Sequence, residues 1–386
     1  MDSMRTLGDP LADDLIRQLF EAREVSNVGG LMKLLTCGHG ASGVGPPPRM
    51  AEYLAATSEL PAWADPARIH AARRFFERNG LQILMLLACY SLPISFAARR
   101  GVQVLHRTGR LQQECRRRLA DTAQLVIDVM AAGGLSPGGC GILSIQKVRL
   151  LHAGVRHLIL VGEKPWNPEF GLPINQEDLA GTLMTFSSVV LDGLKKLGTP
   201  ADEEAAEAYL HVWNVVGSLM GLRMDLLPID KEDAASLSKT ILRRQSSPSE
   251  EGRALMRVLL ATLEENIPAT AFKGLPRTMM RYFLGEEASA VVGLPEGDWT
   301  GHLFQQAMGL NRRLNKLQKQ SDLVSVVTRR LGLTPERWMR LLTTSNEVGR
   351  QRTRSPSGAA IEPWVGRRRV TGRSEITSPS NDGLMV

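Results

Sequence analysis

The sequence predicts an all-α protein, built as one helical domain with additional helices around its core. Apolar residues recur at helical spacing along most of the 386-residue chain. N-cap residues precede these stretches and glycines follow them. No convincing segment between turn signals alternates apolar and polar residues with a period of two, as a strand would. Apolar residues make up 43% of the chain, which is enough for a large buried core.

The first clear helix is expected after Asp65. That residue is a good N-cap, and Pro66 suits the first helical position. The stretch "ARIHAARRFFERNG" then carries the helical pattern, and Asn79-Gly80 is a typical stop.

An apolar run follows from residue 81 to residue 98, "LQILMLLACYSLPISFAA". It approaches the length of a membrane span, but it contains polar residues and Pro93. This pattern favours a buried core helix that is broken at the proline.

Two helices are predicted around a glycine-rich stretch. The first lies within "GRLQQECRRRLADTAQLVIDVMAAGG", residues 109 to 134, and the second runs from about Ser144 to Val161. Between them, "GGLSPGGCG" is interpreted as a tight interhelical connection rather than as a loop that cradles a ligand.

Two further helices follow. In "NQEDLAGTLMTFSSVVLDGLKKLG", Asn175 is the expected N-cap, Asp178 lies three residues later and Gly198 marks the end. The stretch "DEEAAEAYLHVWNVVGSLMGL" again has acidic residues in its first turn and an apolar body.

The sequence lacks the motifs of several enzyme classes. No glycine-rich dinucleotide loop, phosphate-binding loop, Gly-x-Ser-x-Gly elbow or His-Glu-x-x-His pair is present. The cysteines are Cys37, Cys89, Cys115 and Cys140, with no Cys-x-x-Cys pair, so we expect them to be reduced and mostly buried.

The basic character of the chain lies near its C-terminus. Residues 311–386 hold 15 Lys and Arg against 6 Asp and Glu, a net charge of +9, whereas the whole chain carries +7. The Ser-, Pro-, Gly- and Arg-rich residues 346–386 are predicted to form a disordered basic tail. A weak contact with an anionic surface is the alternative, and no nucleic-acid module is recognisable. The beginning of the chain does not resemble a secretory signal, so a cytoplasmic protein is expected.

The segment "RLLHAGVRHLI" places His152 among aliphatic residues on the helix that ends at Val161. Arg149 and Arg156 lie three residues before and four residues after it, broadly on the same side. Such a histidine is either an ordinary core residue or a neutral axial ligand of haem, whose propionates the two arginines could bind. His211, also on an amphipathic helix, is the rival ligand, although a structural role next to Trp213 is favoured.

One helix earlier, Arg118 and Thr122 are four residues apart and therefore share a face. Alone, such a pair is usually a surface or packing feature.

Taken in order, five segments resemble a known family. They are "RRRLADTAQLVIDVM", "GGLSPGG", "QKVRLLHAGVRHL", "GLPINQEDLAGTLMTFS" and "YLHVWNVVGSLMGL". Together they resemble the catalytic domain shared by MpaB-type oxygenases and bacterial latex-clearing proteins, the rubber oxygenases. The resemblance spans residues 60 to 230 and extends weakly to residue 330.

The resemblance implies a globin-like core that holds one haem b, and the use of dioxygen on a hydrophobic substrate. His152 matches the family's haem-ligating histidine, and Arg118 and Thr122 match its distal arginine and threonine. These two side chains would donate hydrogen bonds to bound dioxygen.

Two departures from the rubber enzymes argue against rubber cleavage itself. Asp121 replaces a lysine, and no glutamate lies between Leu81 and Gln113, where the rubber enzymes carry one on the preceding helix. The expected function is therefore a haem-dependent oxygenase acting on an isoprenoid or lipid-like substrate, possibly an alkene. The alternatives are a haem sensor or carrier without turnover, and a helical interaction protein without a cofactor.

The expected organisation has three parts. Residues 1–60 form an N-terminal helix and loop extension, residues 61–345 the haem-binding oxygenase domain, and residues 346–386 the basic tail.

Overall fold

The structure, a computed structural model, describes residues 1–25, 30, 46–109, 114–265, 273–296, 304, 306 and 309. The chain divides into two units, Met1–Ser345 and Asn346–Val386, and every described residue lies in the first. The predicted basic tail lies outside the described residues, and the three-part organisation of the chain stays a prediction.

The described part of the chain is helical, and it contains no strand beyond one isolated antiparallel bridge between Ala98 and Ser246. The prediction of an all-α domain is confirmed. The α-helices are α1 (Pro10–Glu21), α3 (Pro48–Ala56), α4 (Pro66–Leu86), α5 (Leu92–Ser95), α6 (Val102–Thr108), α8 (Cys115–Met130), α9 (Cys140–Val161), α10 (Gln176–Phe186), α11 (Ser188–Leu197), α12 (Glu203–Leu219), α13 (Lys231–Gln245), α14 (Glu250–Glu265) and α15 (Leu275–Val291). Short 3-10 helices are η1 (Asp2–Thr6), η3 (Pro168–Phe170) and η4 (Met224–Leu226), and η2 (Leu87–Ser91) is a π-helix.

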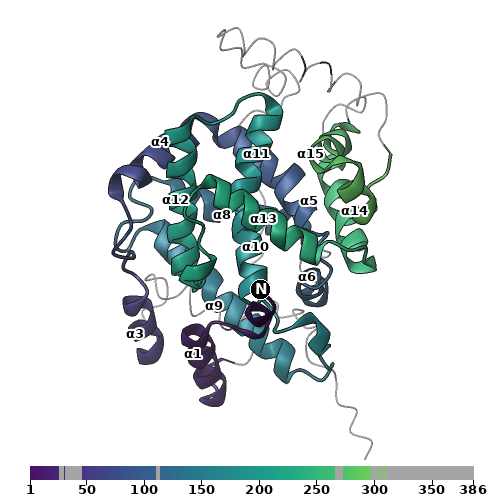
Figure 1. The fold of residues 1–386 in the computed structure, drawn as a ribbon. Helices are drawn as coiled ribbons and strands as arrows, with labels where there is room; N and C mark the ends of the chain where they lie inside the picture. The colour runs from purple at the N-terminus through teal and green to yellow at the C-terminus, as the bar shows by residue number, and fades with distance from the viewer. Residues whose placement is uncertain are drawn as a thin grey trace, which may run out of the picture. The chain divides into compact units, whose positions relative to one another are not determined.

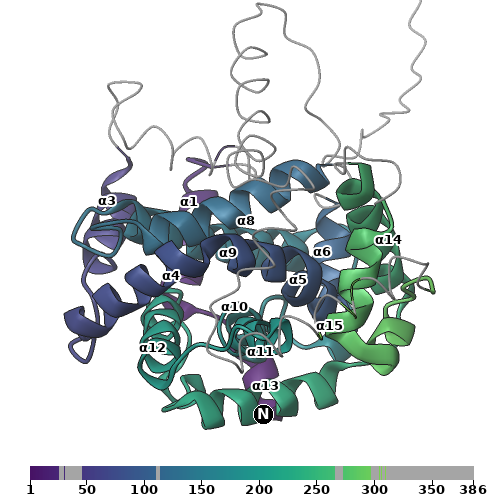
Figure 2. The same ribbon diagram turned by 90° about the horizontal axis from the view of Figure 1, so that it is seen from above.

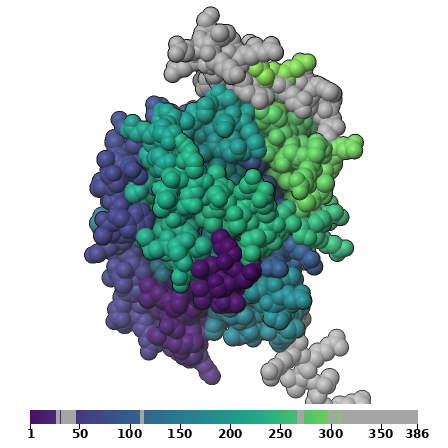
Figure 3. Space-filling model, in the orientation of Figure 1, coloured from purple at the N-terminus to yellow at the C-terminus, as the bar shows by residue number. Residues whose placement is uncertain are grey.

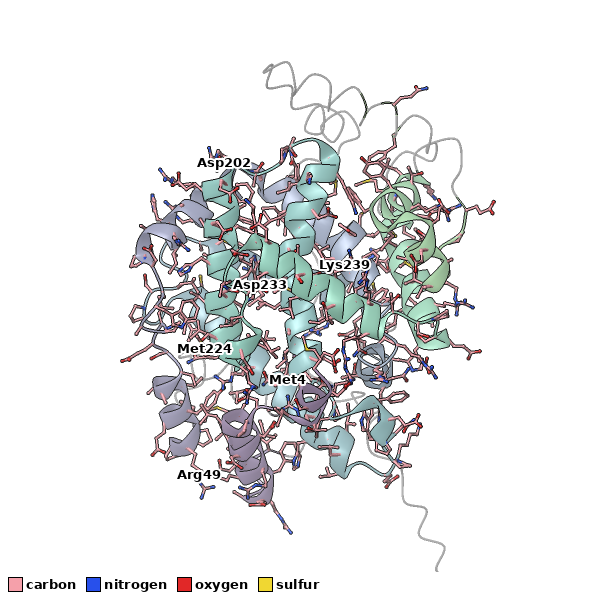
Figure 4. The ribbon with its side chains drawn as sticks, viewed as in Figure 1. Met4, Arg49, Asp202, Met224, Asp233 and Lys239 are labelled. Carbon is pink, nitrogen blue, oxygen red and sulfur yellow. The ribbon has the colours of Figure 1, made fainter. Side chains whose placement is uncertain are left out.

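The main helices are arranged in two layers (Figures 1 and 2). Helices α4, α8 and α9 lie in one layer, and α10 to α13 lie in the other, with α14 and α15 side by side at one end. Helix α12 packs along α4, and α8 packs along α9. Asp202, the N-cap of α12, lies at the start of that helix (Figure 4).

The main core runs through both layers and includes large side chains that are fully buried: Phe96, Tyr209, Trp213 and Phe283. A second, smaller core lies where α1 and α3 pack on α9, and it contains Ile16, Leu19, Met50 and Leu150. Helix α9 therefore contacts the body of the domain and the N-terminal segment at once. Among the described residues, no helix is long and apolar enough to cross a membrane.

Ion pairs hold the first residues of the chain on the body. Arg5 Nη1 donates to Asp178 Oδ1 at 3.0 Å, and Arg244 Nε donates to the fully buried Glu177 at 2.9 Å. Arg244 also pairs with Asp2. Figure 3 shows this N-terminal segment lying against the green surface of α13, and Met4 is labelled on it in Figure 4.

The predicted helix stop at Asn79-Gly80 is wrong, because α4 continues to Leu86. The side-chain amide of Asn79 donates to the Phe75 carbonyl and is satisfied inside the helix. Beyond it, Ile83 and Leu86 are fully buried. Burying two such side chains contributes about 3–6 kcal/mol, which outweighs the ~1 kcal/mol cost of a helical glycine.

The apolar run from residue 81 to residue 98 is buried as predicted, but its irregularity precedes Pro93. The backbone widens into the π-helix η2, and Pro93 then lies in the first turn of α5. The ring of a helical proline crowds the carbonyl four residues earlier, here that of Cys89. That residue lies within η2, so the wider turn accommodates the proline.

The helix predicted from Asn175 to Gly198 is two helices. The caps are confirmed, since Asn175 accepts from the Asp178 amide and Gly198 ends α11 with a left-handed conformation. Between them Ser187 adopts φ −109° and ψ −85°, which separates α10 from α11. The break lets α11 pack against α4 and η2, while α10 packs against η1 and α5.

Candidate active site around His152

Helices α8 and α9 form the frame of the candidate site, and a glycine-rich connection joins them. A Cβ atom at Gly134 would lie 2.1 Å from the Asp128 carbonyl oxygen, and one at Gly141 would lie 2.7 Å from the Gly134 carbonyl oxygen. Gly133 and Gly138 have φ values of +70° and +73°. The prediction of a tight connection is confirmed, although α9 begins at Cys140, earlier than expected.

His152 is partly buried and carries an enclosed ring nitrogen that has no hydrogen bond among the described residues. Its Nδ1 atom is enclosed and has no hydrogen-bond partner in the described part of the chain. Burial, together with the charges of Arg118 and Arg156, lowers the pKa of His152 to about 3. The imidazole is therefore neutral at physiological pH and keeps a lone pair for a ligand.

An unpaired buried nitrogen has an energetic cost, typically about 1–3 kcal/mol. The ring of His152 nevertheless retains some accessible surface. A neutral imidazole whose enclosed Nδ1 atom has no hydrogen bond fits a residue that would hold a metal ion.

Helices α8 and α9 pack along each other, and Arg118 of α8 lies near enough to His152 for its charge to lower the pKa of the imidazole. Thr122 lies one turn further along α8, and its hydroxyl donates to the Arg118 carbonyl at 2.9 Å. To donate to a ligand, the Thr122 hydroxyl has to rotate away from that carbonyl.

Arg149 is buried and joins its own helix to two other parts of the fold. Its Nε and Nη2 atoms donate to the two carboxylate oxygens of Asp9, at 2.6 and 2.8 Å. Its Nη1 atom donates to the Leu219 carbonyl at 3.0 Å. Gly221 has φ +81°, and a Cβ there would lie 2.6 Å from Asp9 Oδ2. Arg149 thus connects α9 to the start of α1 and to the end of α12.

Arg156 is also buried, and it is held in the same manner. It pairs with Asp13 of α1, and it donates to the carbonyls of Pro173 at 3.0 Å and Ile174 at 2.8 Å. We call the two contacts, Asp9 with Arg149 and Asp13 with Arg156, the α1 clamp.

The α1 clamp gives both arginines a structural role that the sequence did not indicate. Every guanidinium nitrogen of Arg149 and Arg156 already has an acceptor within the protein. Binding of haem propionates by these two residues stays a prediction, and it would require some of these hydrogen bonds to be exchanged.

His211, the rival ligand, uses its lone pair within the fold. Its Nε2 atom accepts a hydrogen bond from the Asp65 amide at 2.9 Å. Its ring meets the edge of Trp63 at a centroid distance of 5.7 Å. His211 thus helps to fix the start of α4.

Within the described ranges, no group of three or more His, Cys, Asp or Glu side chains could together hold a metal ion. Of the cysteines that the structure describes, Cys89 and Cys115 are buried and Cys140 is exposed, and all three are free thiols.

The family model described as "ER-bound oxygenase mpaB/B'/Rubber oxygenase, catalytic domain" matches residues 68–313, which include α8, α9 and His152. The chain belongs to this family. It is therefore an oxygenase. The clamp aspartates Asp9 and Asp13 precede the matched range.

Two relatives agree with this assignment. The chain is 29% identical over 289 residues to a rubber oxygenase from Streptomyces sp. (strain K30), a match that covers 74% of this chain and 70% of the relative. The chain is also similar to the solved structure of latex clearing protein in the closed state, with a TM-score of 0.68 and 25% identity. This match covers 89% of this chain and 90% of the chain in that structure.

The α1 clamp predicts a specific loss of stability. Asp9→Asn keeps an acceptor at the start of α1 but leaves Arg149 buried without a counter-charge. We expect the free energy of unfolding, measured by denaturant titration, to fall by about 3 kcal/mol.

Asp14→Asn is the matched control, because Asp14 is exposed on the same helix and pairs only with Arg17 in the contacts described. This variant should lose only about 0–1 kcal/mol in free energy of unfolding. Equal losses in the two variants would contradict a stabilising role for the clamp.

Proposed function

We propose that this oxygenase uses haem b, that His152 is the protein residue that would hold its iron, and that the enzyme acts on a hydrophobic isoprenoid or lipid-like substrate. The observation that carries the proposal is the neutral, enclosed imidazole of His152, whose Nδ1 atom lacks a hydrogen bond. A haem iron takes four ligands from its porphyrin, so a single histidine from the protein suffices.

The chemistry divides between the cofactor and the protein. When bound, haem supplies an iron centre that activates dioxygen. The chain's own residues hold the cofactor, limit the access of water and place charge beside the reacting atoms. Ile145 and Ile159, seven residues before and after His152 on α9, are buried and lie on the same side of the helix as His152.

Arg118 is the residue that we assign to charge stabilisation. Its guanidinium is positive, lies near His152 and belongs to a different helix. A guanidinium at this position would stabilise negative charge that develops on dioxygen. The Thr122 hydroxyl, one turn away, would add a second donor once it leaves the Arg118 carbonyl.

The substrate class follows from the apolar surroundings of the site and from the relatives. Apolar side chains around a site favour apolar substrates, whose transfer out of water costs little free energy. The relative from Streptomyces sp. (strain K30) is a rubber oxygenase, and an alkene of the isoprenoid class is the related substrate for this chain. Rubber itself is not proposed, because Asp121 is exposed in place of the lysine and residues 81–113 contain no glutamate.

The ligand assignment predicts that His152→Ala abolishes stoichiometric haem binding. The substitution removes the imidazole and leaves the helical scaffold, so far-ultraviolet circular dichroism should persist. Haem per chain, measured by absorption and by a pyridine haemochrome assay, should fall at least about tenfold, a loss of about 1.4 kcal/mol or more in binding.

The control is His106→Ala, on the exposed face of α6. It should retain wild-type haem content, and added imidazole should restore part of the haem bound by His152→Ala. A His152→Ala variant with full haem content and an unchanged spectrum would show that His152 is not the ligand.

The roles proposed for Arg118 and Thr122 of α8 predict variants that still bind haem but turn over substrate more slowly. Arg118→Lys keeps the charge but loses the planar fork of donors, and Thr122→Val loses the hydroxyl. Both variants should keep haem and lose oxygen consumption with an alkene substrate by about tenfold or more, at least about 1.4 kcal/mol of barrier.

Arg117→Lys changes an exposed arginine of the same helix, which pairs with Glu114, and should leave turnover unchanged. Wild-type turnover in the Arg118 and Thr122 variants would place both residues outside the reaction.

A further inference from the structure

The α1 clamp places a carboxylate pair beside the helix that carries His152. Arg156 lies one turn after His152 on α9, is 3% exposed, and acts on the imidazole through its charge. Asp13 of α1 forms an ion pair with this guanidinium. The structure therefore contains a buried cation near the candidate ligand whose charge is balanced from outside the family-matched range, residues 68–313.

We propose that Asp13, through its ion pair with Arg156, sets the reduction potential of the iron that His152 would hold. The inference rests on the proposed function. Asp13 is a positioning residue in this account, since it acts through Arg156 and contacts neither substrate nor cofactor.

The position of the Arg156 charge is fixed by its other contacts. Its Nε atom donates to the Pro173 carbonyl at 3.0 Å, and its Nη2 atom donates to the Ile174 carbonyl at 2.8 Å. These two bonds hold the guanidinium in place whether or not Asp13 carries a charge. A substitution at Asp13 thus changes the balance of charge near His152 with little need for Arg156 to move.

The other charges near His152 are balanced or come from the opposite helix. Arg149 forms a two-point pair with Asp9, and Arg118 approaches from α8. Asp13 is the carboxylate that binds Arg156 in the described contacts. Loss of its charge leaves the region more positive by one elementary charge.

The effect on the iron follows from electrostatics. Reduction of ferric to ferrous iron adds one electron, which comes from the electrode or the chemical reductant, and no bond has to form or break. A more positive surrounding favours the added electron, and inside a protein the effect of a charge is only partly screened. Neutralising Asp13 therefore raises the potential.

Asp14 provides a matched control. It follows Asp13 on α1, its side chain is 66% exposed, and it pairs with Arg17 on the same helix. Asp13→Asn and Asp14→Asn thus remove the same charge from neighbouring positions, one beside a buried arginine and one in solvent.

The experiment is a spectroelectrochemical titration of the haem-loaded full-length chain as wild type, Asp13→Asn, Asp14→Asn and Asp13→Glu. Asp13→Asn should raise the ratio of ferrous to ferric protein at a fixed potential about threefold or more. Asp14→Asn should change it much less, and Asp13→Glu, which keeps the carboxylate, should remain close to wild type. If Asp13→Asn folds poorly, as circular dichroism would reveal, Asp13→Ser supplies a second neutral variant for the same comparison.

The possible outcomes distinguish a failure of this inference from a failure of the proposed haem-dependent function. A wild-type chain that takes up no haem overturns the proposed function and this inference together. A haem-loaded protein in which the neutral Asp13 variants match Asp14→Asn overturns the inference alone and leaves the proposed function standing.

Discussion

The two buried arginines of α9 determine how the rest of the structure can be arranged. A buried charge is costly unless it is paired and hydrogen-bonded, and Arg149 and Arg156 flank His152 on a helix that is mostly enclosed. The compensating carboxylates come from Asp9 and Asp13 at the start of the chain. The N-terminal segment is thus part of the folded body, because without it α9 would hold two unpaired cations.

Because both charges are balanced, α9 can present a neutral histidine between the two arginines. The low pKa of His152 has burial as its main cause, with Arg118 and Arg156 adding to it. Buried aliphatic residues of α9, such as Ile145 and Ile159, share the side of the helix that carries His152, and the proposed hydrophobic substrate would suit such surroundings. Packing, charge balance and the candidate chemistry therefore depend on the same two helices and on the segment that covers them.

Local signals made much of the fold predictable, and tertiary contacts explain what was missed. The N-caps at Asp65 and Asn175 and the end of α11 at Gly198 follow from side chains next to the backbone groups that they satisfy. The continuation of α4 through Gly80 and the break at Ser187 depend on what distant helices offer for packing, which periodicity does not contain. For the site, His152, Arg118 and Thr122 came from the segment resemblance, whereas the partners of Arg149 and Arg156 could not be foreseen. Asp9 and Asp13 lie about 140 residues away from them in the chain, and nothing in "DPLADD" indicates a partner.

The proposed function requires that His152 bind a haem. Absorption spectroscopy of the purified wild-type chain, titrated with haem, tests this requirement. We expect a Soret band distinct from that of free haem, with saturation at one haem per chain. A titration in which the added haem keeps the spectrum of the free cofactor, on a chain shown to be folded, would contradict it.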